Sequence, residues 1–151
     1  FGYSVAIDGN TVVVSAIWDD DVGSDSGAVY VFRTTDGGAS YDELAKLTAA
    51  DGARSNDFGW SVAIDGSTIV VGAYGKDGYT GSVYVFRTTD GGATYGQVAK
   101  LTAADGAAED RFAEFVAPAC QDGSERRSCE RRVWQVRGHR RRYRRGRSVP
   151  R

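Results

Sequence analysis

The stretch Phe58-Gly-Trp-Ser-Val-Ala-Ile-Asp-Gly-Ser-Thr-Ile-Val-Val-Gly-Ala73 decides the fold, because the chain contains it twice. The earlier copy is residues 1–16, and 12 of the 16 positions are identical. A second block, residues 27–53, recurs as residues 81–107 with 22 of 27 positions identical. Self-similarity at a period of roughly 55 residues indicates a repeat architecture in which each repeat forms one structural unit.

The repeats divide the chain into parts of different composition. We expect one unit over residues 1–57 and a second over 58–111. Residues 112–151 are expected to begin a third repeat and then to continue as an Arg-rich, disordered tail. Residues 1–112 carry 7 Lys and Arg against 16 Asp and Glu, whereas residues 113–151 carry 12 against 4. The net charge of −1 therefore describes neither part.

The residue composition also excludes some classes of protein. Both cysteines, Cys120 and Cys129, lie in the tail, so the repeats are not a disulfide-stapled scaffold. No run of about 18 apolar residues exists, and we therefore expect no membrane span. The chain begins directly on a repeat, without Met or a signal peptide, so we expect it to be a piece of a longer protein.

The pattern within each repeat predicts four short strands. An alternating segment leads into Asp8-Gly9, which is a favoured hairpin turn, and a nearly all-apolar segment suited to a buried strand follows. The third strand should place Val29 and Val31 on one face and Tyr30 and Phe32 on the other. In repeat one the predicted strands are residues 4–8, 11–16, 27–34 and 41–49, and repeat two follows the same order. Four strands per repeat match one blade of a β-propeller, so the expected fold class is all-β.

Two features of the repeated block resemble the FG-GAP repeat family. Phe1-Gly2 and Phe58-Gly59 are each followed by Val-Val-x-Ala. The GAP triplet falls on Ser15-Ala16-Ile17 and Gly72-Ala73-Tyr74, and neither copy keeps the proline. The resemblance extends to about Phe112. It implies blades like those of integrin α-subunits and of bacterial and algal surface proteins. A propeller closes with about four to eight blades, so the remaining blades are expected outside this chain.

A second motif recurs between the third and fourth predicted strands. Residues 34–41 and 88–95 resemble the Asp-box of sialidase-type propellers, with the aspartates at Asp36 and Asp90. An Asp side chain can accept hydrogen bonds from turn amides, while the following aromatic residue packs into the blade. This resemblance also implies a propeller.

The acidic loop after the second strand is a candidate metal site. The resemblance to integrin-type propellers implies a Ca²⁺ loop within a blade. Asp19, Asp21 and Asp25 could supply oxygen ligands at alternate positions. The pattern is incomplete, because Gly23 replaces the middle carboxylate, and the loop of repeat two keeps only Asp77. The alternative is a solvated acidic loop.

Aromatic residues in the same loops are candidates for a binding surface. Trp18, Tyr74 and Tyr79 lie between strands, where propellers gather their loops on one face. Such rings would suit sugar stacking or protein contact, and the alternative is packing against a neighbouring blade. The aromatic residues of the repeated block, by contrast, are expected in the core: Phe1, Tyr3, Phe58 and Trp60.

The repeats offer little for catalysis. The only histidine, His139, lies in the tail, and Arg33 and Arg87 recur once per repeat after a strand, which favours an architectural role. The expected function is a non-enzymatic binding or adhesion module, at a cell surface or outside the cell, for a protein or carbohydrate ligand. The alternatives are a sialidase-type glycoside hydrolase, argued from the Asp-boxes, and a purely structural repeat.

The tail after the start of the third repeat has three interpretations. It could be a basic arm for nucleic acid or an acidic surface, a disordered tail, or the product of a shifted reading frame. The change of composition is abrupt and falls inside a repeat, which favours the frameshift and argues against nucleic acid as a partner. We expect disorder beyond about Ala119. We also expect at least one broad face of the two repeats to lack a covering blade.

Overall fold

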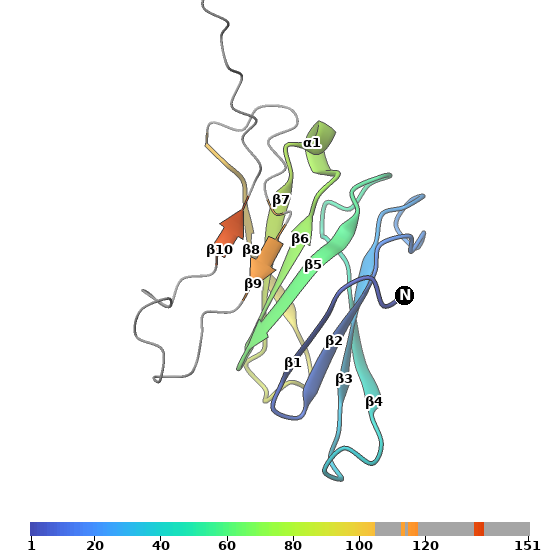
Figure 1. Cartoon of the computed structure of the whole chain (residues 1–151), viewed down its shortest axis with the longest axis vertical. Coiled ribbons are helices and arrows are strands. Elements are labelled where there is room, and N and C mark those ends of the chain that lie inside the picture. Colours follow the sequence, from blue (N-terminus) through green and yellow to red (C-terminus); the bar gives the residue numbers. More distant parts are fainter. Residues whose placement is uncertain (105–112, 114, 118–134, 138–151) are drawn as a thin grey trace, which may run out of the picture.

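The computed structural model of the chain describes residues 1–104, 113, 115–117 and 135–137 (Figure 1). Two four-stranded antiparallel sheets, one from each repeat, lie face to face. This confirms the predicted all-β fold class and is consistent with neighbouring blades of a propeller.

Each sheet follows the order of its strands in the chain. The first contains β1 (Val5–Asp8), β2 (Thr11–Ala16), β3 (Ala28–Arg33) and β4 (Asp42–Leu47). The second contains β5 (Phe58–Asp65), β6 (Thr68–Ala73), β7 (Ser82–Arg87) and β8 (Gly96–Leu101), with the short helical turn α1 (Lys76–Tyr79) between β6 and β7. Each repeat therefore contributes four strands, as its pattern predicts.

The first hairpin turn of each repeat is one residue later than predicted. Asp8 still pairs with Thr11 in the ladder, so the turn residues are Gly9 and Asn10 rather than Asp8 and Gly9. Glycine accepts the positive φ of 53° at the first turn position, which leaves the aspartate in the strand. There the Asp8 carboxylate accepts a hydrogen bond of 2.6 Å from the amide of Gly66, in the matching turn of the next repeat.

The main core lies between the two sheets. One face of each strand in repeat one, including Val13, Val29 and Val31, packs against repeat two. Repeat two contributes larger side chains to this core, among them Phe58, Val62, Ile64, Ile69, Val71, Tyr84 and Phe86. Val13 and Val31 are fully buried, as the strand alternation predicts.

The other broad face of repeat one is exposed. We define this open face by Val5, Ile7, Val12, Val14, Tyr30 and Phe32, which the strand register places side by side. Val5 is 58% exposed and Ile7 is 63% exposed. Phe1 lies against Tyr30 and Phe32 at ring distances of 5.4 and 6.3 Å, yet remains 76% exposed. The expectation of an under-covered face is thus confirmed for the described residues.

The far face of repeat two packs against the start of the third repeat. Val70 and Val83 form a second core with Ala113 and Val116. Val85, which corresponds to the buried Val31 of repeat one, is only partly buried beside this cluster. In the described part of the third repeat, the short strand β9 (Phe115–Ala117) lies against this face and pairs with β10 (Gln135–Arg137).

Strand β10 differs from the expectation of disorder beyond Ala119. It pairs antiparallel with β9, and Val136 lies opposite Val116. The first two strands of repeat two pair in the same way, with Val62 opposite Val71. A segment of the basic tail thus takes the place of a second strand. The other tail residues, 118–134 and 138–151, lie outside the described part of the chain, as do Cys120, Cys129 and the Arg-rich segment.

Candidate binding surface at the loop end of the sheets

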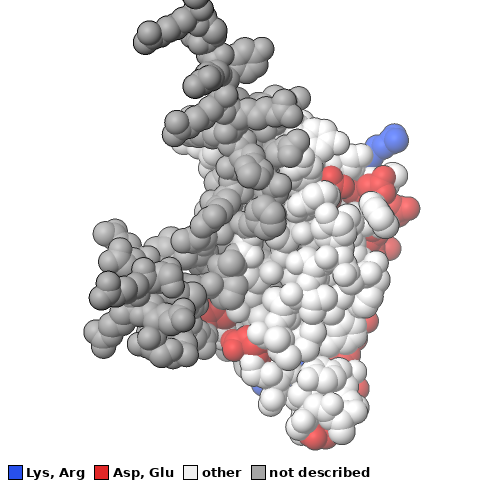
Figure 2. Space-filling model, in the orientation of Figure 1, with Lys and Arg blue, Asp and Glu red and all other residues white. Residues whose placement is uncertain are grey.

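Three connections meet at one end of the two sheets, which we call the loop end. They are the β2–β3 loop, the β6–β7 loop with α1, and the linker from β4 to β5 (Figure 1). Figure 2 shows acidic side chains gathered there over repeat one, while much of the face in view is uncharged. The loop end therefore holds both candidate sites of the sequence analysis.

Four aromatic rings form a continuous row at this end and link the two repeats. We call Tyr3, Trp60, Tyr74 and Tyr79 the aromatic row. The ring centroids of Tyr3 and Trp60 are 4.9 Å apart, those of Trp60 and Tyr74 are 4.6 Å apart in a stacked arrangement, and those of Tyr74 and Tyr79 are 5.4 Å apart. Rings in such contact hold one another in place, so the row is a preorganised surface.

The two ends of the row face solvent. Tyr3 is 48% exposed and Tyr79 is 49% exposed, while Trp60 and Tyr74 between them are partly buried. The structure thus brings together two of the three aromatic residues that the sequence singled out, Tyr74 and Tyr79. Trp18 is not part of the row, although it is 72% exposed in the β2–β3 loop.

The prediction that Phe1 and Tyr3 belong to the core was wrong, because Phe1 is 76% exposed and Tyr3 is 48% exposed, and Trp60 is only partly buried. Tyr3 and Trp60 occupy the same position in the two repeats. Both follow the glycine of a Phe-Gly pair, whose positive φ of 80° at Gly2 and 94° at Gly59 interrupts the alternation of side chains along the strand. Phe58 accordingly enters the core, and Trp60 lies at the loop end. A signal was present in the sequence, because this position differs between the repeats yet stays aromatic.

A carboxylate lies beside the aromatic row. Burial, and then the nearby charge of Asp25, raise the pKa of Asp57 above its ordinary value. Burial, followed by the charge of Asp57, raises the pKa of Tyr3. A Cβ atom added at Gly75, next to Tyr74, would lie only 2.7 Å from the Asp57 carboxylate. The carboxyl group of Asp57 therefore borders the row.

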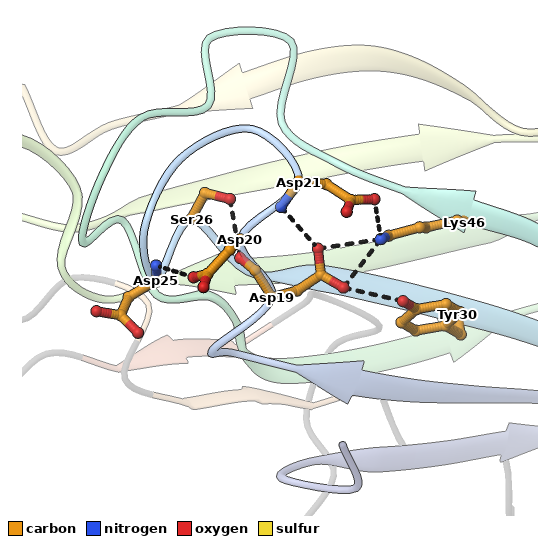
Figure 3. Close-up of polar contacts among 7 residues, drawn as sticks. All are labelled: Asp19, Asp20, Asp21, Asp25, Ser26, Tyr30 and Lys46. Carbon is orange, nitrogen blue, oxygen red and sulfur yellow. Dashed lines mark hydrogen bonds and ion pairs between the residues drawn. The ribbon is translucent and has the colours of Figure 1, made fainter.

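The acidic loop of repeat one converges on a lysine (Figure 3). The Asp19 carboxylate accepts hydrogen bonds from Lys46 Nζ at 2.9 and 3.0 Å and from the Tyr30 hydroxyl at 2.9 Å. Asp21 accepts a further hydrogen bond from the same ammonium group. Burial alone would raise the pKa of Asp19, but the hydrogen bonds from Lys46 and Tyr30 outweigh it and lower that pKa. The pair is thus a stable salt bridge in which Asp19 stays ionised.

The third predicted ligand, Asp25, lies apart from this pair. Figure 3 shows its carboxylate away from those of Asp19 and Asp21. Its backbone amide donates a hydrogen bond of 2.7 Å to Asp20, and its φ is 55°. Within the described ranges, no group of three or more His, Cys, Asp or Glu residues is placed to hold a metal ion. As placed, the three aspartates do not form a ligand set.

Calcium binding by this loop stays a prediction and has a direct test. If Asp19, Asp21 and Asp25 bind Ca²⁺ after rearrangement, calorimetric titration should give saturable heat that Asp21→Ala abolishes. Lys46→Gln should strengthen binding, because it removes the cation that Asp19 and Asp21 now share. The absence of heat at millimolar Ca²⁺ in both the parent chain and Lys46→Gln would contradict the prediction.

The two Asp-containing turns lie at the opposite end of the sheets, between β3 and β4 and between β7 and β8. Asp36 accepts hydrogen bonds from the Ser40 amide at 3.0 Å and from the hydroxyls of Ser40 and Thr34, both at 2.7 Å. These bonds hold the pKa of Asp36 well below its usual range, and Asp90 has the same arrangement with Thr88 and Thr94. The carboxylates organise turns and are far from the aromatic row.

The candidates for catalysis remain unsupported or untested. His139 lies outside the described residues. Arg33 donates a hydrogen bond to the carbonyl of Gly91, in the corresponding turn of repeat two, which fits an architectural role. No described helix is long and apolar enough to cross a membrane.

Comparison with known proteins agrees with the repeat architecture. The model of the FG-GAP repeat family matches residues 1–32 and 41–86, which together make up more than half of the chain. Both Asp-containing turns fall outside the matched segments, so their resemblance to the Asp-box stays a prediction. A search of curated proteins found no match. The repeated Phe-Gly pairs, the two four-stranded sheets and the family match agree, and the chain belongs to the FG-GAP repeat family.

Proposed function

We propose that this chain is part of a non-enzymatic binding module that contacts a protein ligand through the aromatic row. FG-GAP repeats are β-propeller-type units that often occur in adhesion proteins, and they are generally non-catalytic. They are also typical of extracellular or surface proteins, and we propose the same location here. The observation that carries the proposal is the row of Tyr3, Trp60, Tyr74 and Tyr79 across two repeats.

The row has the properties of a protein-binding hot spot. Tyrosine and tryptophan supply large contact areas at low cost in conformational entropy, and they dominate the energetics of protein interfaces. The contacts among the four rings reduce that cost further, because the rings are already held in place before a ligand arrives. The partly buried centre and exposed ends also suit a surface that is completed by a partner.

A protein ligand fits the row better than a carbohydrate does. A sugar stacks on the open face of an aromatic ring, but Trp60 and Tyr74 cover part of each other in a stack with an interplanar angle of 24°. The ring faces that Trp60 and Tyr74 turn toward each other are therefore not available to a sugar. Trp18 is the most exposed of the candidate aromatics and, in the β2–β3 loop, is the best position for a sugar contact at the loop end.

The test compares loop-end variants with a control at the opposite end. Labelled parent chain is applied to an array of extracellular-matrix proteins and to a glycan array, and turnover of a fluorogenic sialoside is measured in parallel. Tyr79→Ser and Trp60→Ser should each weaken binding to the protein array by at least about tenfold, because they break the row. Tyr41→Ser is the matched control, since Tyr41 is exposed to a similar degree, 43%, near the Asp-containing turns.

Each other outcome supports a different function. Binding to glycans that depends on Trp18 would assign a carbohydrate ligand instead. Turnover of the sialoside would support the hydrolase alternative. If binding were unaffected by every loop-end substitution, or equally affected by Tyr41→Ser, the row would have no binding role, and a structural repeat would be the better interpretation.

A further inference from the structure

Both repeats carry the same tyrosine and lysine pair on equivalent faces of their sheets. In repeat one, Lys46 Nζ lies 5.2 Å from the ring centroid of Tyr30, and in repeat two Lys100 Nζ lies 5.7 Å from that of Tyr84. Each tyrosine hydroxyl donates a hydrogen bond to an aspartate that also contacts the lysine. One carboxylate thus completes the pair in each repeat.

The two carboxylates come from different parts of the chain. In repeat one the carboxylate is Asp19, the third residue of the loop that follows β2 within the same repeat. In repeat two it is Asp51, which belongs to the linker from the preceding repeat and contacts Tyr84 and Lys100 at 2.7 Å each. The shortest salt bridge of the pair is therefore internal in repeat one, whereas in repeat two Lys100 lies 2.7 Å from the linker residue Asp51 and 3.7 Å from Asp77 of its own loop.

At the loop position that corresponds to Asp19, repeat two carries a residue of opposite charge. The third residue after Ala73 is Lys76, where repeat one has Asp19. Lys76 is 8% exposed, and its ammonium group lies 3.0 Å from the Asp51 carbonyl oxygen and 3.5 Å from its carboxylate. The carboxylate of Asp51 in the linker thus lies beside a basic residue, Lys76, in the β6–β7 loop.

The open face of repeat one is the counterpart of a face that is covered in repeat two. Its Tyr30 and Phe32 correspond to Tyr84 and Phe86, which are buried against repeat one. The covering unit brings small β-branched side chains to that interface, and its linker brings Asp51. The interface between the two repeats thus shows how a neighbouring repeat covers the face that carries the tyrosine and phenylalanine of the third strand.

We propose that the open face of repeat one docks a further FG-GAP repeat whose linker has no acidic residue at the position of Asp51. Asp19 and Asp21 already occupy Lys46 in repeat one. An additional carboxylate from a linker would meet these two like charges without a cation of its own, which opposes docking. The loop residue at position 19 or 76 and the linker residue at position 51 together determine which repeats can be neighbours.

The proposed charge matching between the linker residue at position 51 and the loop residue at position 76 is first tested within the existing chain. Lys76→Asp should raise the equilibrium constant for unfolding by at least about tenfold, because it replaces the ammonium group that contacts Asp51 and Asp77 with a further carboxylate. Adding Asp51→Asn to Lys76→Asp should recover most of that loss, because the loop then supplies the carboxylate as it does in repeat one. If the double variant lost as much stability as Lys76→Asp alone, or as much as the two single variants combined, the proposed dependence on the charges at positions 51 and 76 would be overturned.

The docking surface is tested in a longer chain. A second copy of residues 1–57 is joined in front of Phe1, either unchanged or with Asp51→Asn in the added copy. The Asn version should be the more stable by about tenfold in the unfolding equilibrium constant. Asp19→Lys in the original repeat one should reverse the preference, since that repeat then resembles repeat two.

Three results would overturn this proposal. If neither added copy stabilised the original repeats, the open face would not dock a repeat. If both copies stabilised them equally, the charge at position 51 would not select the neighbour. If the original chain formed a dimer that Ile7→Lys dissociated, a second copy of the chain would be the occupant of the open face instead.

Discussion

Replacing Gly59 by alanine should cost about 3 kcal/mol of folding free energy, whereas the same change at Gly2 should cost about 1 kcal/mol. Both glycines belong to a Phe-Gly pair, and both have positive φ, 94° at Gly59 and 80° at Gly2. A positive φ is unfavourable for alanine at either site, so the backbone contribution is nearly the same in the two variants.

The difference arises from the packing of repeat two on repeat one. A Cβ atom at Gly59 would lie 2.8 Å from the Cβ of Ser15 and 3.2 Å from the carbonyl oxygen of Ala28. A Cβ atom at Gly2 would meet nothing within 4 Å. Only Gly59→Ala therefore forces the two sheets apart.

Urea unfolding followed by circular dichroism measures both losses. The two glycines share residue type, motif and backbone conformation. The difference between the losses of folding free energy in the two variants therefore measures the effect of the close contact between the sheets. Equal losses would show that the close approach of β5 to the first sheet contributes nothing, and would contradict the arrangement in Figure 1.

Much of the fold follows from the sequence because the repeat indicates the number of strands, their order and the faces of each sheet. A strand pattern that occurs twice is unlikely to arise by chance, and the alternation of Val29, Tyr30, Val31 and Phe32 assigns the two faces of β3 correctly. The observed turn at Gly9 lies one residue later than predicted. Asp-Gly is a favoured turn dipeptide, but here Asp8 stays in the strand and its carboxylate accepts a hydrogen bond from Gly66 of the other repeat.

The candidate site was less predictable, because it depends on which loops reach across a sheet. Periodicity places Tyr30 and Lys46 on one face, but it does not say that Asp19 will complete the pair in repeat one and Asp51 in repeat two. In the same way, Tyr74 and Tyr79 were recognisable as loop residues, whereas their contact with Trp60 depends on the backbone conformation at Gly59.

The other large expected effect concerns the phenylalanine of the Phe-Gly pair. Phe58→Ala should cost about 3–5 kcal/mol, the range for truncating a fully buried aromatic residue. Phe58 is completely buried, and its ring lies 5.5 Å from that of Tyr84 and 5.9 Å from that of Phe86. It belongs to the core between the sheets, so its removal leaves a cavity where neither sheet can easily collapse.

Phe1→Ala is the control, because Phe1 makes the same type of ring contacts with Tyr30 and Phe32 but is 76% exposed. Its loss should be below about 1 kcal/mol, since most of the ring surface is already in contact with water. The same urea titration compares the two variants, and a loss at Phe1 as large as that at Phe58 would mean that the open face is covered in solution. In the extended chain with an added repeat, by contrast, Phe1→Ala should become nearly as costly as Phe58→Ala, because docking would bury the ring as repeat one buries Phe58.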